Sequence, residues 1–425
     1  MQRRHLIFLA LIALAAVSCA RVETDFTWNE EFGYEESHSP VVFSWYAARN
    51  NGATKANPDI YVGEGSSHLR SGNSFGVFGY FHPQSGTTSN PVAGGWKDGV
   101  NNNYPNFFYN EGVSIAERPN GKYAYTYTNS RFWPRNEYDR ISFFAYYPYN
   151  PGIAQGTPGP DTIVESFLDS NYEREGLVGF YYIVKEQADQ QVDFMISDLC
   201  LDQNKAVWEN NHSQGLTIGN DVSATEDKTG TVKFFFHHAL SQIRIKSVNF
   251  DASGNDKVTV NVNYIRFNNV AVFGQCIPVP DFTSTTSTGR TTVTPTWPAN
   301  SLTNQRPDLT SGVQADVCYT DPDDPTTLIP DNILLMIPHE FFTGATIEVN
   351  FDVTRDLDDP NDPTGEHYEY LNNTLTAPLT TSKVYGWEPG KIYTYNINLN
   401  LKKITIDADV VDWIDAGDDV MMDNN

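Results

Sequence analysis

Apolar and polar residues alternate with a period of two in several parts of the chain. Residues 258–264 alternate valine or tyrosine with threonine or asparagine, and residues 393–401 alternate tyrosine, isoleucine or leucine with threonine or asparagine. This period places the apolar side chains of a segment on one face of a β-strand and the polar ones in water. The alternation changes phase at Lys402 and Lys403 and resumes at Ile404, which predicts a bulge or a turn there.

Two shorter runs, SFFAYY at 142–147 and TVKFFF at 231–236, are more densely apolar and favour central strands of a sheet. Clusters of Gly, Pro, Asn and Ser separate these segments, as turns between strands require. Helical turns are expected only near Phe167–Glu175 and Leu199–Lys205. Aromatic residues make up 13% of the chain and charged residues only 19%, which excludes an all-helical protein and predicts an all-β one.

The length of 425 residues suits two domains. A polar stretch, Asn210–Gly230, separates two strand-rich halves. We therefore predict an N-terminal β-sandwich domain over residues 39–225 and a C-terminal β-sandwich domain over residues 226–425, both with long loops. The second domain would end in an extension over residues 404–425.

The first residues predict an export signal. Arg3 and Arg4 precede an apolar run, 6–17, that is too short to span a bilayer comfortably. Small residues then lead up to Cys19, as in a bacterial lipoprotein signal, so we expect residues 1–18 to be removed and Cys19 to be acylated. Residues 19–38 would form a linker. The alternative is an ordinary secretory signal in which this cysteine is incidental.

Charge and motifs exclude several classes of function. The chain carries 53 acidic and 28 basic residues, a net charge of -25 that opposes binding to nucleic acid. It contains no HExxH, Walker A or SxxK motif, and no GxGxxG motif after a strand, so we predict no catalytic residue and no enzyme activity. The three cysteines after Cys19 match no zinc-binding spacing; buried thiols are favoured over one disulfide and a free thiol.

The candidate metal ligands have structural explanations. His237 and His238 follow each other at the end of the 231–236 run, so their rings point to opposite faces of a strand and do not bind one metal together. We expect one ring to be buried with a backbone partner and the other to be exposed. The acidic segment Asp356–Asp362 lacks the glycine and the closing glutamate of a calcium-binding EF-hand loop, so a solvated loop is predicted there. No metal and no cofactor are predicted.

Several segments, in this order, resemble the fimbrillin family, the lipoprotein precursors of type V pili. The resembling segments are residues 54–56, 73–81 (NSFGVFGYF), 125–149, 192–202 (VDFMISDLCLD), 232–245 (VKFFFHHALSQIRI), 328–341 and 387–399 (WEPGKIYTYNINL). The resemblance implies two tandem transthyretin-like β-sandwich domains. It also implies a structural or adhesive subunit of a surface fimbria, at the cell outer membrane through its lipid anchor. Its partners would be other pilin subunits and a host glycan or protein.

The resemblance further implies assembly by strand exchange, in which a protease removes an N-terminal strand and a neighbouring subunit supplies a replacement. Pro40–Ala48 is apolar and suits the removable strand, and Arg49 and Lys55 follow it as first and second cleavage candidates. The alternative for these two residues is a pair of solvated loop charges that no protease uses.

The C-terminal run 404–413 (ITIDADVVDW) is the candidate donor strand, with Ile404, Ile406, Val410 and Trp413 as the inserted side chains. It also suits pairing within its own domain, and the two roles are compatible. The rival function is a monomeric, lipid-anchored carbohydrate-binding protein, since 8 Trp and 23 Tyr include enough rings for sugar stacking, although many lie in core-forming strands.

Overall fold

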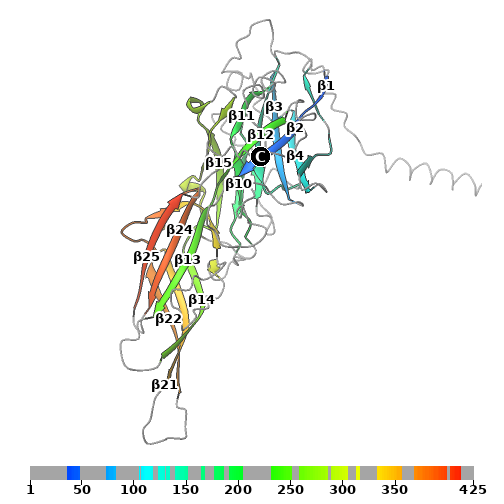
Figure 1. Ribbon diagram of the computed structural model, residues 1–425. Helices are drawn as coiled ribbons and strands as arrows, with labels where there is room; N and C mark the ends of the chain where they lie inside the picture. Colours follow the sequence, from blue (N-terminus) through cyan, green and yellow to red (C-terminus); the bar gives the residue numbers. More distant parts are fainter. Residues whose placement is uncertain are drawn as a thin grey trace, which may run out of the picture.

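In the residues that it describes, the computed structural model is built almost entirely of β-strands, together with two single-turn 3-10 helices, η3 (Phe282–Ser284) and η4 (Ala299–Ser301). Figure 1 shows a broad upper lobe and a narrower lower lobe made of long strands. The structure describes residues 36–47, 73–82, 105, 107–117, 123–129, 131–134, 139–151, 164–167, 177–185, 191–203, 231–250, 258–285, 289–304, 313–315, 333–356, 368–399 and 403–412.

The upper lobe is organised around a nine-stranded sheet. Seven of its strands follow one another in space in the order β2 (Val42–Ala47), β12 (Thr231–His238), β10 (Met195–Ser197), β7 (Arg140–Tyr147), β3 (Ser74–His82), β4 (Phe108–Glu117) and β5 (Tyr123–Thr126). The other two, β11 (Leu199–Gln203) and β16 (Arg290–Thr291), branch from β7. The edge strands β2 and β5 contact each other, so the sheet curls round on itself.

Three smaller sheets complete the described part of the upper lobe and its junction with the lower lobe. A four-stranded sheet consists of β17 (Val293–Thr296), β15 (Phe273–Pro280), β9 (Gly179–Ile183) and β8 (Val164–Phe167). One pair is β1 (Glu36–Pro40) with β6 (Phe132–Pro134), and another is β20 (His339–Glu340) with β23 (Gly386–Trp387).

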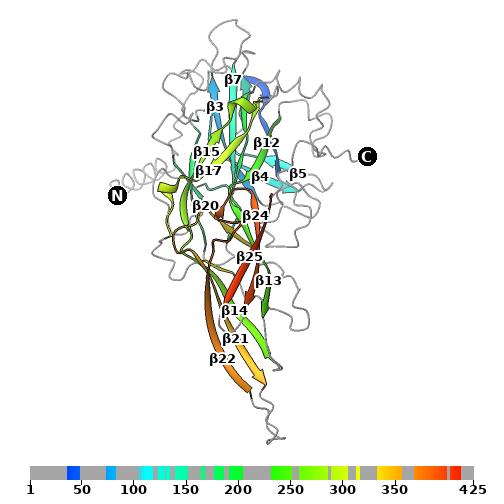
Figure 2. The same cartoon turned by 90° about the vertical axis from the view of Figure 1, so that its left-hand side faces the viewer.

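The lower lobe contains two four-stranded sheets, whose long strands are seen from the side in Figure 2. One sheet has the order β19 (Ile333–Met336), β13 (Ser241–Phe250), β24 (Lys391–Leu399) and β25 (Ile404–Asp412). The other has the order β18 (Val313–Ala315), β14 (Val258–Asn268), β21 (Thr346–Asp356) and β22 (Tyr368–Pro378). The predicted all-β sandwich fold is confirmed.

Apolar side chains cover both faces of the nine-stranded sheet. One face, including Phe78, Phe144 and Tyr146, belongs to a buried cluster that continues into the lower lobe. The opposite face, including Phe75 and Phe143, belongs to a second cluster, which the curled edges of the sheet enclose. Burial on both faces explains why β7 and β12 have almost continuous apolar sequences, as their dense runs predicted.

Two local predictions from the sequence have different outcomes. Leu199–Lys205 was expected to form a helical turn, and this is wrong: residues 199–203 form β11, which pairs with β7 and β16. Cross-strand hydrogen bonds and burial of its leucines override a weak local preference. The predicted buried thiols are confirmed for Cys200 and Cys276, whereas Cys318 lies outside the described residues.

The predicted boundary between residues 225 and 226 falls between β11 and β12. Strands on its C-terminal side nevertheless pair with strands on its N-terminal side: β12 with β10, β16 with β11, and β15 with β9. The hydrogen-bonded sheets therefore do not divide at that position. The division of the chain into domains at residues 39–225 and 226–425 stays a prediction.

Candidate functional site

The segment predicted to be removable forms an edge strand of the main sheet. β2 pairs in parallel with β12, from Val42 opposite Thr231 to Ala47 opposite Phe236. At the end of the sheet order, β2 has a ladder on one side only. The apolar, β-branched sequence around Val42 therefore becomes a strand whose attachment depends on a single neighbour and on its buried side chains.

Phe43 attaches β2 to the core. Its side chain is 1% exposed, and its ring lies 5.4–5.7 Å, centroid to centroid, from four other rings. Those rings belong to Phe108, Tyr127, Phe143 and Phe234. Burial of one phenylalanine side chain stabilises by about 2–3 kcal/mol, so this contact is a major part of the strand's attachment.

Val41, just before the β2–β12 ladder, is held through its backbone. Its N–H donates to the carbonyl oxygen of Arg131 over 2.9 Å, and its carbonyl oxygen accepts a hydrogen bond of 2.6 Å from the Tyr127 hydroxyl. The same hydroxyl accepts from the Arg131 N–H over 3.3 Å. Burial raises the pKa of Tyr127 to about 12, so the hydroxyl stays protonated and remains a donor at neutral pH.

The residues before Val41 add a second attachment. β1 pairs antiparallel with β6, with Glu36 opposite Pro134 and Pro40 opposite Phe132. Trp133 of β6 is 1% exposed and meets the ring of Phe143 edge to face. Residues 36–47 thus cross from one small sheet to the main sheet. We call β12, the four rings around Phe43, and Arg131 the strand seat.

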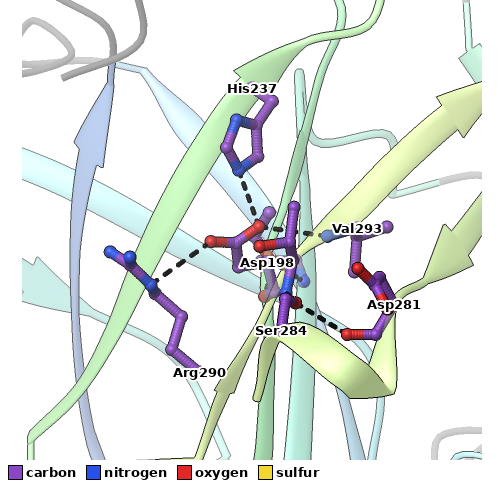
Figure 3. Close-up of polar contacts among 9 residues, drawn as sticks. Asp198, His237, Asp281, Ser284, Arg290 and Val293 are labelled. Carbon is purple, nitrogen blue, oxygen red and sulfur yellow. Dashed lines mark hydrogen bonds and ion pairs between the residues drawn. The ribbon is translucent and has the colours of Figure 1, made fainter. Parts of the chain in front are cut away.

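A buried polar cluster lies on the far side of β12 from β2. The Asp198 carboxylate accepts from the backbone N–H of Val293 over 3.1 Å and pairs with the His237 ring over 2.6 Å (Figure 3). The guanidinium of Arg290 lies 3.7 Å from the same carboxylate. One aspartate thus connects the β10–β11 junction with β12, β16 and β17.

The neighbouring histidine has its own carboxylate. His238 Nδ1 lies 2.6 Å from Asp193 Oδ2, and both side chains are 1% exposed. The expected backbone partner for the buried histidine is therefore wrong, because the partner is a carboxylate that β10 brings alongside β12. The side chain of His237 is 23% exposed and is also paired. Within the described residues, no group of three or more His, Cys, Asp and Glu side chains has the spacing of a metal site.

The predicted donor strand exists as β25 and pairs antiparallel with β24 from Ile404 opposite Leu399 to Asp412 opposite Lys391. Ile404 is buried, Ile406 is half-buried and Val410 is 42% exposed. β25 is the edge strand of its sheet, so its other side has no ladder among the described strands. Its pairing within its own lobe is the state seen here, and its role as a donor stays a prediction.

Four other predicted site residues lie outside the described residues: Cys19, Arg49, Lys55 and Trp413. Sequence reasoning missed Tyr127 and Arg131, which hold Val41. Nothing in the sequence around them indicates this contact, because it joins residues that are 86 positions apart. The aromatic lining was partly foreseeable, because Phe143 and Phe234 lie in the two densely apolar runs.

A carboxyl group at the end of β11 leads to a prediction about pH. Burial raises the pKa of Asp202 to about 6, although Arg140 opposes the shift. Since an unfolded Asp has a pKa of about 3.9, stability falls as the pH rises from about 4 to about 6. We expect Asp202→Asn to stabilise the protein at pH 7 by about 2–3 kcal/mol, and by much less at pH 4. Urea unfolding at the two pH values measures this, and an equal gain at both would contradict it.

The structure is a β-sandwich protein whose main sheet has β2 as an edge strand. No described helix is both long and apolar enough to cross a membrane. The chain belongs to the fimbrillin-like family, whose profile matches residues 54–413. This membership supports a pilus or cell-adhesion protein at the cell surface and a structural, non-enzymatic role.

Two solved structures illustrate which chains are similar to this one. A fimbrial protein from Bacteroides vulgatus ATCC 8482 is 19% identical, with a TM-score of 0.48, and the match covers 88% of this chain and 99% of that one. A protein from Bacteroides uniformis ATCC 8492, provisionally described as a cell adhesion protein, is 13% identical, with a TM-score of 0.38 and coverages of 87% and 97%. No curated protein matches the chain.

Proposed function

We propose that this protein is a structural or adhesive subunit of a surface pilus. It is exported as a lipoprotein through acylated Cys19, held at the outer membrane, and assembled after removal of its N-terminal strand. The observation that carries the proposal is the position of β2, an edge strand with a core side chain, Phe43, close before Arg49 and Lys55 in the sequence. Family membership supports the same class of function.

Removal of β2 would leave an unpaired sheet edge and an open apolar pocket, both of which a replacement strand would cover. The outer edge of β12 would lose its ladder partner, so backbone N–H and C=O groups beside an apolar core would be left without hydrogen bonds. The space of Phe43 would open between four aromatic rings. An extended segment from another subunit would satisfy both the backbone and the apolar surface, which is strand addition at a sheet edge.

The donor segment in this proposal is the C-terminal strand of another subunit, with Ile404, Ile406, Val410 and Trp413 as the inserted side chains. To act as a donor, β25 must leave β24 of its own subunit and pair with β12 of the neighbouring, cleaved subunit. This exchange breaks one strand pairing and forms another. The partners are other pilin subunits, and an adhesive role would add a host glycan or protein as ligand.

Limited trypsin digestion of the full chain tests the proposal. We expect new N-termini at Asn50 or Ala56 by intact mass, followed by ladders of high-molecular-weight species on gels. The matched control is the Arg49→Ala/Lys55→Ala variant, which should keep its N-terminal segment and form no ladders under the same digestion. Clean removal of residues 20–49 that leaves only monomers would overturn the strand-exchange mechanism.

A further inference from the structure

Two described segments carry the chain across the junction between the upper and the lower lobe (Figure 1). Residues 239–240, the first crossing, connect β12 with β13, and residues 269–272, the second crossing, connect β14 with β15. Both crossings are buried, with Ala239 and Ala271 each 0% exposed. Buried backbone groups need hydrogen-bond partners inside the protein, so these partners decide how firmly the two lobes are joined.

The first crossing is held by groups that do not titrate near neutral pH. The N–H of Ala239 donates to the carbonyl oxygen of Phe194, and its carbonyl oxygen accepts from Trp297 Nε1, both over 2.9 Å. The carbonyl oxygen of Leu240 accepts from the N–H of Gly390 over 2.9 Å. Phe194 precedes β10 and Trp297 follows β17, whereas Gly390 precedes β24, so both lobes hold this segment.

The second crossing depends on a histidine. The N–H of Ala271 donates to Nε2 of His339 over 3.2 Å, and Nδ1 of the same ring lies 2.8 Å from the carbonyl oxygen of Ile337. A backbone N–H can only donate and a carbonyl can only accept, so the ring is neutral and carries its proton on Nδ1. A second proton would bind to Nε2, and Ala271 would then lose its acceptor.

Three aromatic side chains surround this histidine. His339 is 6% exposed, and the centroid of its ring lies 5.1 Å from that of Phe342, 5.5 Å from that of Trp387 and 5.9 Å from that of Phe341. Burial lowers the pKa of His339, and the hydrogen bond with Ile337 opposes this shift. A charged imidazolium is therefore disfavoured in the closed junction.

The charged and titratable groups on the neighbouring elements do not compensate an imidazolium. Those on β20 and beside β23 are exposed: Glu340, Tyr385 and Glu388. Burial raises the pKa of Tyr393 and Tyr395 on β24, so both stay neutral. Arg266 on β14 pairs with Glu348 on β21 over 3.2 Å. Among the residues that the structure describes, no carboxylate forms an ion pair with the His339 ring.

We propose that His339 is an acid-sensitive switch at the lobe junction: its protonation releases Ala271 and opens the second crossing, while both lobes stay folded. The first crossing has no titrating partner and remains as a pivot. The angle between the lobes is therefore fixed at neutral pH and variable in acid. This inference does not depend on strand exchange or on the proposed function.

The direction of the pH effect follows from linkage. In the open junction the imidazole is in water, with an ordinary pKa of about 6.5, and in the closed junction its pKa is lower. The closed junction is therefore favoured above about pH 6.5 and loses stability as the pH falls below that value. The equilibrium constant for opening rises by up to about tenfold for each pH unit, until the pKa of the closed state is reached.

Hydrogen–deuterium exchange of the full chain tests the switch, with each rate corrected for the intrinsic pH dependence of exchange. We expect the protection of residues 269–273 to fall at least about threefold between about pH 7.5 and about pH 5. Residues 141–146 of β7 and residues 347–353 of β21, one strand from each lobe, should keep their protection.

His339→Gln isolates the titrating group. The Oε1 atom of glutamine can accept from Ala271 and does not titrate, so this variant should show no acid-specific fall in the protection of residues 269–273. His237→Gln is the matched control, because it removes a histidine that lies outside the junction. The fall at residues 269–273 should persist in that control.

The possible outcomes are distinct. A loss of protection confined to residues 269–273, present in the natural sequence and absent from His339→Gln, supports the switch. An equal loss in both lobes would mean global unfolding in acid, and no loss would mean that the junction does not respond; either result overturns the proposal. A loss that persists in His339→Gln also overturns it. If that variant does not fold, the pattern in the natural sequence decides between confined, equal and absent loss.

Discussion

Replacing Asp193 by alanine is expected to destabilise the protein by about 3–5 kcal/mol, the range found when one partner of a buried charged pair is removed. Asp193 Oδ2 lies 2.6 Å from His238 Nδ1, and both side chains are 1% exposed. Without the carboxylate, Nδ1 of the buried imidazole would lose its hydrogen-bond partner. The pair also joins the segment just before β10 to β12, so the loss would weaken the strand that carries the seat.

Urea unfolding of the full chain measures this effect. Asp407→Ala is the matched control, because Asp407 forms an ion pair of 3.4 Å with Lys383 in which both side chains are more than half exposed. A surface pair of this kind contributes at most about 1 kcal/mol. If Asp193→Ala cost no more than the control, the buried pair would not be a stabilising element of the sheet.

Gly76→Ala is the second change with a large expected effect, about 3 kcal/mol or more, because it overfills a closed part of the core. Gly76 and Tyr146 are opposite each other on β3 and β7, and a Cβ at Gly76 would lie 2.1 Å from Cε1 of the tyrosine. The ring of Tyr146 has little freedom to move away. It stacks on Phe78, contacts Phe180 and donates from its hydroxyl to Asn110 Oδ1 over 2.7 Å.

The physical reason can be checked with a double-mutant cycle. Tyr146→Leu is itself destabilising, but it vacates the space that the new methyl group needs. We therefore expect Gly76→Ala to cost much less in the Tyr146→Leu background than alone, a coupling of about 1–3 kcal/mol. Ser74→Ala, on the same strand, is the control for a general effect on β3. Additive losses would show that the clash with Tyr146 is not the cause.

Local sequence patterns predicted individual strands well where burial repeats with period two. The alternations at 258–264 and 393–401 became β14 and β24, and the change of phase at Lys402–Lys403 comes just before β25, which begins at Ile404. The prediction of a helical turn at 199–205 was wrong because β11 is stabilised by partners about 60 and 90 residues away. No local preference contains that information.

The site was predicted in part. An apolar strand at residues 40–48 could be recognised from its composition, and β2 confirms that a strand occupies 42–47. Its parallel pairing with β12 joins residues about 190 positions apart. Its backbone is also bound at Val41 by Tyr127 and Arg131, and nothing in the local sequence around these two residues indicates that contact. Likewise the carboxylate partners of His237 and His238 depend on β10 lying beside β12.

From the sequence one could read that the protein is all-β, that the alternating and densely apolar segments form strands, and which family the chain resembles. These properties follow from period-two burial and from ordered local motifs, which each segment carries alone. Tertiary structure alone decided which strands are neighbours, that β2 is an edge strand with Phe43 among four rings, and that Asp193 and Asp198 meet consecutive histidines. The reason is physical: alternation defines which face of a strand is apolar, but the choice of partner depends on contacts between residues far apart in the chain.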